Sequence, residues 1–212
     1  MRLIAEDLAG ARGGETVFSG VYFALVDGDA LVVTGPNGSG KSTLLRIVAG
    51  LLPAASGRIE FDGPDDASSV ASACHYLGHQ NAMKTALTVA ENLAFWRDFL
   101  GSSRLSIGDA LDAVGLDGLG DLPFSVLSTG QKRRAAIARL LVSHRPVWLL
   151  DEPTVGLDAE SEANFAELMT AHLGDGGIVI AATHLPLGLK REKTLRMGED
   201  GATGLPFPQG RG

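Results

Sequence analysis

Residues 35–43 read Gly35-Pro36-Asn37-Gly38-Ser39-Gly40-Lys41-Ser42-Thr43, and this stretch decides the fold of the chain. It follows an apolar segment, residues 30–34, that predicts a buried strand, and it opens residues 42–52, which predict a helix. Glycines let backbone N–H groups converge on phosphate oxygens, and the helix start adds a favourable dipole. We therefore predict a nucleotide-phosphate site in which Lys41 reaches the β- and γ-phosphates and Ser42 binds Mg²⁺. A glycine turn with an incidental lysine is disfavoured, because the motif and its strand–helix context agree.

Two carboxylates, Asp151 and Glu152, follow the apolar residues 147–150, which predict another buried strand. Ligands bind at the carboxyl ends of strands in parallel sheets, so both side chains should face the glycine-rich loop. Asp151 suits a Mg²⁺ site reached through water, and Glu152 is placed to polarise an attacking water as a general base. Two exposed loop acids would be the alternative, which the apolar strand before them disfavours.

A third segment, Leu127-Ser128-Thr129-Gly130-Gln131, lies just upstream of the acidic strand. It precedes a predicted helix over residues 132–142. A small hydroxyl residue and a glycine at a helix start make a second anion site, so Ser128, Gly130 and Gln131 are candidate nucleotide contacts. Taken alone, the segment could be an ordinary N-cap, but its position between the other two motifs favours a nucleotide site.

The pattern of apolar residues predicts an α/β fold: a P-loop NTPase core with an N-terminal antiparallel β region and an inserted helical subdomain. Strands are expected within residues 3–33, 58–62, around 70–77 and over 178–183, and a helix over 159–173. The insert carries a capping box, Thr88-Val89-Ala90-Glu91, before a helix reaching Leu100, and a second helix over residues 106–114. We expect one domain over 1–212, with its core in 1–81 and 143–212 and the helical subdomain at about 82–142.

The composition limits the classes of function that the chain can have. The 212 residues include 45% hydrophobic and 20% charged side chains, which is typical of a globular domain. The net charge of −7 disfavours broad nucleic-acid binding, so no nucleic-acid partner is expected. The single cysteine, Cys74, cannot form an internal disulfide, which fits a reducing cytoplasm. Apolar runs are far shorter than the roughly 20 residues of a spanning helix, and no signal peptide is evident, so the membrane-spanning part of any transport machine would be another chain.

The three motifs, in this order, resemble the ATP-binding cassette (ABC) ATPases over nearly the whole chain. In that family the L-S-x-G-Q segment serves the ATP bound to the opposite protomer, which implies a homodimer that sandwiches two nucleotides, with ATP and Mg²⁺ as cofactors. The resemblance implies that Gln80 is the Q-loop glutamine, which senses Mg²⁺ and the γ-phosphate. It also implies that Gly156-Leu157-Asp158 is the D-loop, whose Asp158 would in addition cap the next helix, and that His184 is the H-loop histidine near the γ-phosphate.

One element departs from the ABC pattern. Many members stack adenine on an aromatic residue about 25–30 positions before the P-loop glycine, but residues 8–14 contain no aromatic side chain. Arg12 could stack its guanidinium on the base instead, or Phe18 could substitute. The residue that contacts adenine is therefore left open.

A narrower resemblance rests on two stretches. Residues 76–93 have Gly-His before Gln80 and Lys-Thr-x-Leu-Thr after it, and residues 127–136 have Thr129 where most ABC proteins have glycine. Together with the short length, these features resemble the ATP-binding subunits of the cytochrome c maturation system, the haem exporter ATP-binding proteins. The resemblance implies membrane-spanning ABC subunits of the CcmB and CcmC type as partners and a peripheral location on the cytoplasmic face of the bacterial inner membrane. It also implies ATP hydrolysis linked to haem delivery and release of a haem-loaded chaperone.

Alternative functions differ in class. The motor motifs are shared by ABC transporters, so another cargo stays possible. Soluble ABC ATPases of DNA repair or translation usually carry coiled coils or two cassettes, and this chain has neither. A P-loop kinase or GTPase would leave residues 128–131 unexplained, and the guanine-reading Asn-Lys-x-Asp motif is absent.

Two further side-chain groups receive plainer interpretations. The basic residues after Gln131 predict a solvated face of the helix; they are Lys132, Arg133, Arg134 and Arg139. The remaining histidines predict ordinary surface or core positions rather than a metal site; they are His75, His79, His144 and His172. A haem ligand at Cys74-His75 is disfavoured, because a strand dipeptide is too little to define one.

Overall fold

The computed structural model describes residues 1–63, 69–189 and 192–198. Its residues form two compact units. The sheet unit comprises Met1–Tyr76, Pro146–Pro153 and the described residues from Thr170 onward, and the helical unit comprises Leu77–Arg145 and Thr154–Met169. Within the described ranges, no helix has both the length and the apolar character needed to cross a membrane.

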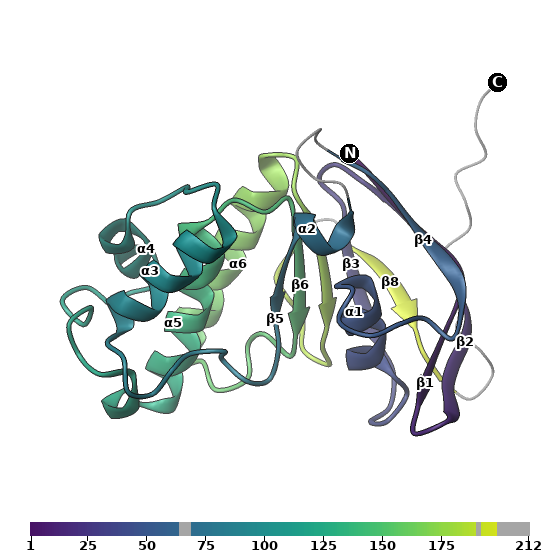
Figure 1. The fold of residues 1–212 in the computed structure, drawn as a ribbon, viewed down its shortest axis with the longest axis horizontal. Helices are drawn as coiled ribbons and strands as arrows, with labels where there is room; N and C mark the ends of the chain where they lie inside the picture. The colour runs from purple at the N-terminus through teal and green to yellow at the C-terminus, as the bar shows by residue number, and fades with distance from the viewer. Residues whose placement is uncertain (64–68, 190–191, 199–212) are drawn as a thin grey trace. The chain divides into compact units, whose positions relative to one another are not determined.

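A three-stranded antiparallel sheet opens the sheet unit, in the order β2-β1-β4. Its strands are β1 (Arg2–Arg12), β2 (Glu15–Val26) and β4 (Ser56–Asp62). Val21, Phe23 and Leu25 alternate toward the core and are at most 1% exposed, as the period of two of a strand with one buried face requires. Figure 1 shows β1 and β2 as long arrows at the start of the chain, with β4 beside them.

The second sheet has five strands in the order β5-β6-β7-β3-β8. They are β5 (Cys74–Leu77), β6 (Val147–Asp151), β7 (Ile178–Ala182), β3 (Ala30–Thr34) and β8 (Lys193–Arg196). β6 pairs with β7, and β3 pairs with both β7 and β8, all in parallel. All five residues of β6 and of β7 are buried, as expected of strands covered on both faces. Because β3, β6 and β7 are parallel, their carboxyl ends lie at the same edge of the sheet.

Helix α1 (Lys41–Val48) lies between the two sheets, where it contacts β1 on one side and β6 and β7 on the other (Figure 1). Its apolar side chains belong to the core formed by both sheets; they are Leu44, Leu45, Ile47 and Val48. A short helix, α2 (Val70–Ala73), precedes β5. The packing of α1 fixes where the loop before it begins.

The helical unit is built around α5 (Thr129–Val142), which packs against α3 (Val89–Leu100) and α4 (Ile107–Ala113). A 3₁₀ turn, η1 (Phe124–Val126), precedes α5, and the first residues of α6 (Ala159–Gly174) complete the unit. The capping box at Thr88 is confirmed: Glu91 N–H donates to Thr88 Oγ1 at 3.1 Å, and Thr88 N–H donates to Glu91 Oε2 at 2.8 Å.

Three local predictions were wrong at their boundaries. The helix expected over residues 42–52 ends at Val48, because Gly50 takes a φ of +69° that stops it. The strand expected around residues 70–77 starts only at Cys74, since Ser69 and Ser72 form a capping box that makes Val70–Ala73 helical. The helix expected from residue 132 begins at Thr129, with Ser128 as its N-cap. Lys190 and Arg191, part of a basic stretch near the C-terminus, lie outside the described residues.

We predict that Gly57→Ala destabilises the fold more than Gly20→Ala. Gly57 opposes two residues of β1, since the register slips between Glu6 and Ala9, and this makes a β-bulge. A Cβ on Gly57 would collide with the backbone carbonyls of Glu6 and Asp7, whereas one on Gly20 would meet nothing within 4 Å. Both glycines have a positive φ, +82° and +67°, so the second variant isolates the backbone cost of about 1 kcal/mol. Urea unfolding should show roughly 2–4 kcal/mol lost for Gly57→Ala; equal losses would contradict the bulge geometry.

Candidate functional site

The loop between β3 and α1 depends on glycine at its first and last positions. Gly35 has a φ of +142°, and a Cβ there would run into the carbonyl oxygen of Met197. Gly40 has a φ of +93°, and a Cβ there would lie 2.7 Å from Phe18 Cδ1. Side chains at either position would push the loop away from the core, so the glycines let the backbone turn closely over the start of α1.

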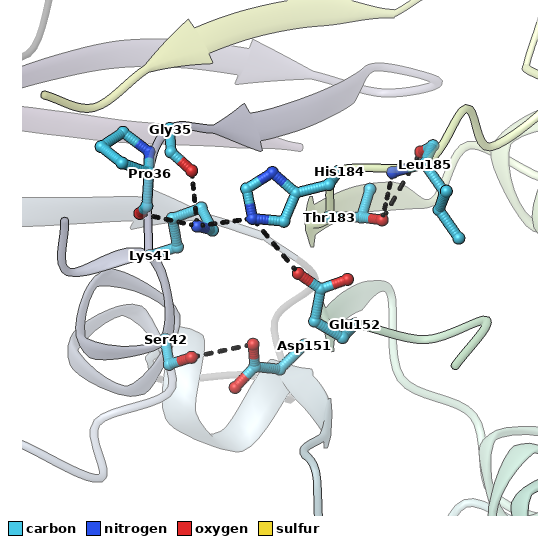
Figure 2. A network of polar contacts seen from close by, with 9 residues as sticks. All are labelled: Gly35, Pro36, Lys41, Ser42, Asp151, Glu152, Thr183, His184 and Leu185. Atoms are coloured by element: carbon cyan, nitrogen blue, oxygen red, sulfur yellow. Dashed lines mark hydrogen bonds and ion pairs between the residues drawn. The ribbon is translucent and has the colours of Figure 1, made fainter. Parts of the chain in front are cut away.

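Lys41 turns its ammonium group back into this loop. Nζ donates to the carbonyl oxygens of Gly35 at 2.7 Å and Pro36 at 3.0 Å, and it lies 3.1 Å from Nε2 of His184 (Figure 2). An ammonium group only donates hydrogen bonds, so Nε2 must accept and carries no hydrogen in this arrangement. Lys41 is 8% exposed, and its three partners satisfy the three donors of a nearly buried cation.

Ser42 and Asp151 meet across the gap between α1 and β6. Ser42 Oγ donates to Asp151 Oδ1 at 2.9 Å (Figure 2), and Asp151 is the last residue of β6, only 1% exposed. Since β6 is a central strand of the parallel sheet, its carboxyl end holds this carboxylate rigidly. The pair is therefore formed by the packing of α1 against β6.

Glu152 is the first residue past β6 and is held in an unusual backbone conformation. Its φ is +46°, which costs a non-glycine residue of the order of 1–2 kcal/mol, and its N–H donates to the carbonyl of Ala182 at 2.8 Å. That bond ties Glu152 to the end of β7, just before His184. Glu152 Oε1 lies 3.9 Å from Nε2 of His184 (Figure 2), which is an approach of two functional groups and not a hydrogen bond. Strain of this kind gathers at functional sites.

The loop has the features of a phosphate site. α1 has no side-chain cap at its N-terminus, which leaves its first backbone N–H groups directed out of the helix. In the described part of the chain, Ser39 Oγ is buried without a hydrogen-bond partner. Phosphate oxygens are acceptors that satisfy both kinds of donor.

Within the same described ranges, no three His, Cys, Asp or Glu side chains are grouped to hold a metal. A Mg²⁺ ion here would use Ser42, Asp151 and phosphate oxygens, the mixture that this ion favours.

The candidate residues of the helical unit gather at the start of α5. Ser128 Oγ accepts from the Gln131 N–H at 3.2 Å, and Gln131 Oε1 accepts from the Ser128 N–H at 2.9 Å, a complete capping box. A Cβ on Gly130 would lie 3.1 Å from the carbonyl oxygen of Gly156, so the D-loop segment lies directly against this helix start. Glycine at 130 therefore allows the two backbones to approach.

Asp158 caps α6, as the sequence predicts. Its Oδ1 accepts from the Ser161 N–H at 2.8 Å, and this backbone hydrogen bond lowers the pKa of the Asp158 carboxyl. Gln80 also belongs to the helical unit, where it is exposed in a bend three residues after β5. The structure thus brings together the candidates of the sheet unit (the loop 35–40, Lys41, Ser42, Asp151, Glu152 and His184) and, separately, those around α5.

Comparisons with known proteins identify the family. A family model described as ABC transporter matches residues 18–155. A cytochrome c biogenesis ATP-binding export protein CcmA from Mesorhizobium japonicum is 69% identical over 202 residues, which cover 95% of this chain and 100% of that protein. A protein of the same name from a Chelativorans species is 65% identical, covering 93% and 98%.

The chain belongs to the CcmA family of ABC transporter ATP-binding proteins.

Solved structures agree on the fold of this CcmA-family chain. An ABC transporter ATP-binding protein of Pyrococcus furiosus superposes with a TM-score of 0.80 at 23% identity, covering 93% of this chain and 98% of that one. A dimeric ATP-binding cassette in a post-hydrolysis state, bound to ADP and Pi, superposes with a TM-score of 0.78 at 23% identity, covering 92% and 94%. The prediction of an ABC ATPase fold, a P-loop core with antiparallel and parallel sheets, is confirmed.

The prediction of a solvated basic face on α5 was wrong. Arg133 and Arg139 are each only 5% exposed. Arg133 Nη1 donates to the carbonyl of Gly78 at 2.8 Å, and Arg139 stacks its guanidinium 4.5 Å from the ring centre of Trp96. Burial lowers the pKa of Arg139 to about 10, and the charge of Arg133 adds to the effect. Arg134 donates to the carbonyls of Val114 and Gly115 at 3.2 and 2.7 Å, so three arginines of this helix bind other segments.

Sequence reasoning also missed two side chains next to Asp151. Tyr76, on β5, donates from its hydroxyl to Asp151 Oδ2 at 3.3 Å, and Arg46 Nε donates to the Tyr76 hydroxyl at 3.3 Å. Burial raises the pKa of the Tyr76 phenol, and the hydrogen bond with Tyr76 raises the pKa of Arg46. The only sequence signal was the spacing of Ser42 and Arg46, which puts them on one face of α1.

The two residues suggested for adenine stacking differ in exposure. Phe18 is buried, so its ring belongs to the core, whereas Arg12 is exposed.

We predict that Arg133→Gln lowers the free energy of unfolding by about 2–3 kcal/mol, because a charged hydrogen bond to the buried Gly78 carbonyl is lost. Lys132→Gln is the matched control, because Lys132 bonds the exposed carbonyl of Ser125 and should change stability by no more than about 0.5 kcal/mol. Urea unfolding of the two variants measures the difference. Indistinguishable stabilities would mean that Arg133 is solvated after all.

Proposed function

We propose that this chain is the ATP-hydrolysing subunit of a membrane export complex and that it acts in c-type cytochrome biogenesis. The observation that carries the proposal is the meeting of Lys41, Asp151, Glu152 and His184 around the loop 35–40 in the sheet unit (Figure 2). A phosphate-binding cation, a metal carboxylate, a general base and a second γ-phosphate contact are the parts that phosphoryl transfer to water requires.

The P-loop would hold the ATP phosphates. Backbone N–H groups within residues 37–43 and the Ser39 hydroxyl would donate to phosphate oxygens, and the Lys41 ammonium would exchange the carbonyls of Gly35 and Pro36 for the β- and γ-phosphates. Bound Mg²⁺ supplies neutralisation of the charge on the β- and γ-phosphates. Ser42 would hold it directly, while Asp151 and Gln80 would orient its water ligands.

Glu152 would accept a hydrogen bond from the attacking water and align it for in-line attack on the γ-phosphorus. His184 would contact a γ-phosphate oxygen, and for this Nε2 must carry a hydrogen. In the structure Nε2 accepts from Lys41, so the transfer of Lys41 to phosphate releases this nitrogen for the other tautomer. The binding of phosphate in the loop would therefore also allow His184 to take the tautomer that donates from Nε2.

Two copies are needed for a complete site. Ser128, Gly130 and Gln131 of one copy would close over the γ-phosphate bound to the other, with Asp158 close to the interface. The start of α5 supports this role, since a 14-residue helix directs its first N–H groups outward there and Gly156 lies against it. A similar fold solved as a dimer with ADP and Pi supports the arrangement as well.

The printed name of the relatives, cytochrome c biogenesis ATP-binding export protein, supports a membrane export complex as the partner. We propose that the chain binds membrane-spanning subunits of the CcmB and CcmC type at the cytoplasmic face of the bacterial inner membrane. Movement of the helical subdomain, near Gln80–Thr88, would transmit nucleotide binding to them. Haem delivery and release of the haem chaperone would be the work performed. We also propose that the whole chain, 1–212, forms one ABC ATP-binding domain, with a core of 1–81 and 143–212 and a helical subdomain of about 82–142.

We predict that Glu152→Gln slows ATP hydrolysis at least about 100-fold while ATP binding persists, because the amide cannot accept the proton of the attacking water. A closed dimer should then accumulate with ATP and be visible by light scattering during gel filtration.

Glu167→Gln makes the same chemical change at an exposed position of α6, farther from Asp158, and should leave hydrolysis and the monomer–dimer balance unchanged. Lys41→Ala should abolish both binding and the trapped dimer. Normal hydrolysis by Glu152→Gln would refute the assignment of Glu152 as the base.

We also predict that deleting the gene removes all covalently attached haem from the membranes of the source bacterium. The wild-type chain should restore c-type cytochromes, and Glu152→Gln should not, because the step requires hydrolysis. Haem staining of membrane proteins measures both. Normal cytochromes after deletion, with no second copy of the gene, would leave an ABC motor for another cargo.

A further inference from the structure

A chain of donors reaches the buried end of Asp151 from helix α1. Ser42 and Arg46 are four residues apart, so they lie one turn apart on the same face of α1. Ser42 Oγ donates directly to Asp151 Oδ1 at 2.9 Å. Arg46 acts on the other oxygen through Tyr76: its Nε donates to the Tyr76 hydroxyl, which donates to Asp151 Oδ2, each at 3.3 Å.

The direction of these two hydrogen bonds follows from which groups can donate and which can accept. A guanidinium has no acceptor, so the Tyr76 oxygen must accept from Arg46. A tyrosine hydroxyl has one hydrogen, which is then left for Asp151 Oδ2, a carboxylate oxygen that only accepts. Arg46 thus fixes which way the Tyr76 hydroxyl points. Asp151 thus accepts from Ser42 at Oδ1 and from Tyr76 at Oδ2, two donors on different elements, α1 and β5.

The two donors differ in what happens when a metal binds. Ser42 is a proposed metal ligand, so its hydroxyl would turn away from Oδ1 and leave this oxygen to the water shell of the ion. Tyr76 is not a ligand and can keep Oδ2. Asp151 is 1% exposed, and bulk water cannot take the place of the phenol. Outer-shell groups that hold a ligand in this way typically contribute 10–100-fold in metal affinity or activity.

We propose that Tyr76, oriented by Arg46, is a positioning residue that holds the Asp151 carboxylate for Mg²⁺. The inference rests on the proposed function, because it assumes that Asp151 serves the metal. Tyr76 also packs against the hydrophobic core of the sheet unit, so a purely structural role is the competing explanation. Phenylalanine keeps the ring and removes only the hydroxyl, which separates the two roles.

The test measures metal dependence in the full chain without relying on turnover alone. The equilibrium binding of trinitrophenyl-ATP is measured in EDTA and across a Mg²⁺ titration. Tyr76→Phe should bind as tightly as wild type in EDTA but need roughly 10-fold more Mg²⁺ for half of the metal-dependent gain in affinity. In ATPase assays the half-saturating Mg²⁺ concentration should rise similarly, while kcat at saturating Mg²⁺ stays within about 3-fold.

Two controls fix the interpretation. Tyr22→Phe changes the other tyrosine of the chain, on β2, and should leave every value unchanged. Arg46→Ala should shift the Mg²⁺ requirement in the same direction, and adding it to Tyr76→Phe should give little further loss, because Arg46 acts through the hydroxyl. Asp151→Asn should abolish the metal-dependent gain.

A Mg²⁺ requirement of Tyr76→Phe equal to that of wild type, with Asp151→Asn impaired, would overturn the role of Tyr76 and leave the proposed function intact. Equal shifts in Tyr76→Phe and Tyr22→Phe would also overturn it. An Asp151→Asn variant with normal metal dependence would instead sink the metal role of Asp151, and the inference would fall with it. If the role of Tyr76 is positional and not structural, the Tm of Tyr76→Phe should lie within about 2 °C of that of wild type.

Discussion

The packing of α1 between two sheets is the constraint on which the site depends. Its apolar side chains fill the core that both sheets share, so the helix cannot rotate or slide without opening that core. Its polar side chains are placed as a consequence. Lys41 and Ser42 stand at the N-terminus, where the glycine loop ends, and Arg46 follows one turn later. The loop itself is pressed against Phe18 and Met197, where only glycine fits.

Two nearly buried charges are stabilised there by different means. The Lys41 cation is satisfied by two backbone carbonyls and an imidazole, which are neutral acceptors that a phosphate can outcompete. The Asp151 anion receives hydroxyl donors on both oxygens, which hold it in place. Burying an ion without partners costs far more than either arrangement. The cation is therefore free to change partners, whereas the carboxylate is fixed.

The helical unit solves a similar problem with arginine. The C-terminal part of α5 is buried, from Ala135 to Val142. Two of its arginines bind backbone carbonyls, Arg133 that of Gly78 and Arg134 those just after α4, and Arg139 lies over Trp96. Arg133 Nη1 also donates to the side-chain Oδ1 of Asn81 at 3.5 Å, so it contacts one residue on each side of Gln80. Planar guanidinium groups with several donors can cross-link such loops while remaining charged. The same helix begins at Ser128, and its position is thereby tied to the residues that flank Gln80.

Sequence spacing was enough to predict the motif order, the strands whose residues alternate or are wholly apolar, and the caps at Thr88 and Asp158. These depend on spacing within one segment, and local physics decides them. The tertiary structure alone decided that Arg133 and Arg139 are buried, that Phe18 is a core side chain, and that Tyr76 reaches Asp151. Charge on a helix predicts solvent exposure unless neighbouring segments supply acceptors, and no pattern along α5 reveals them. Likewise, β5 and β6 are adjacent in the sheet but lie 75 residues apart at Tyr76 and Asp151, so only chain folding brings the hydroxyl to the carboxylate.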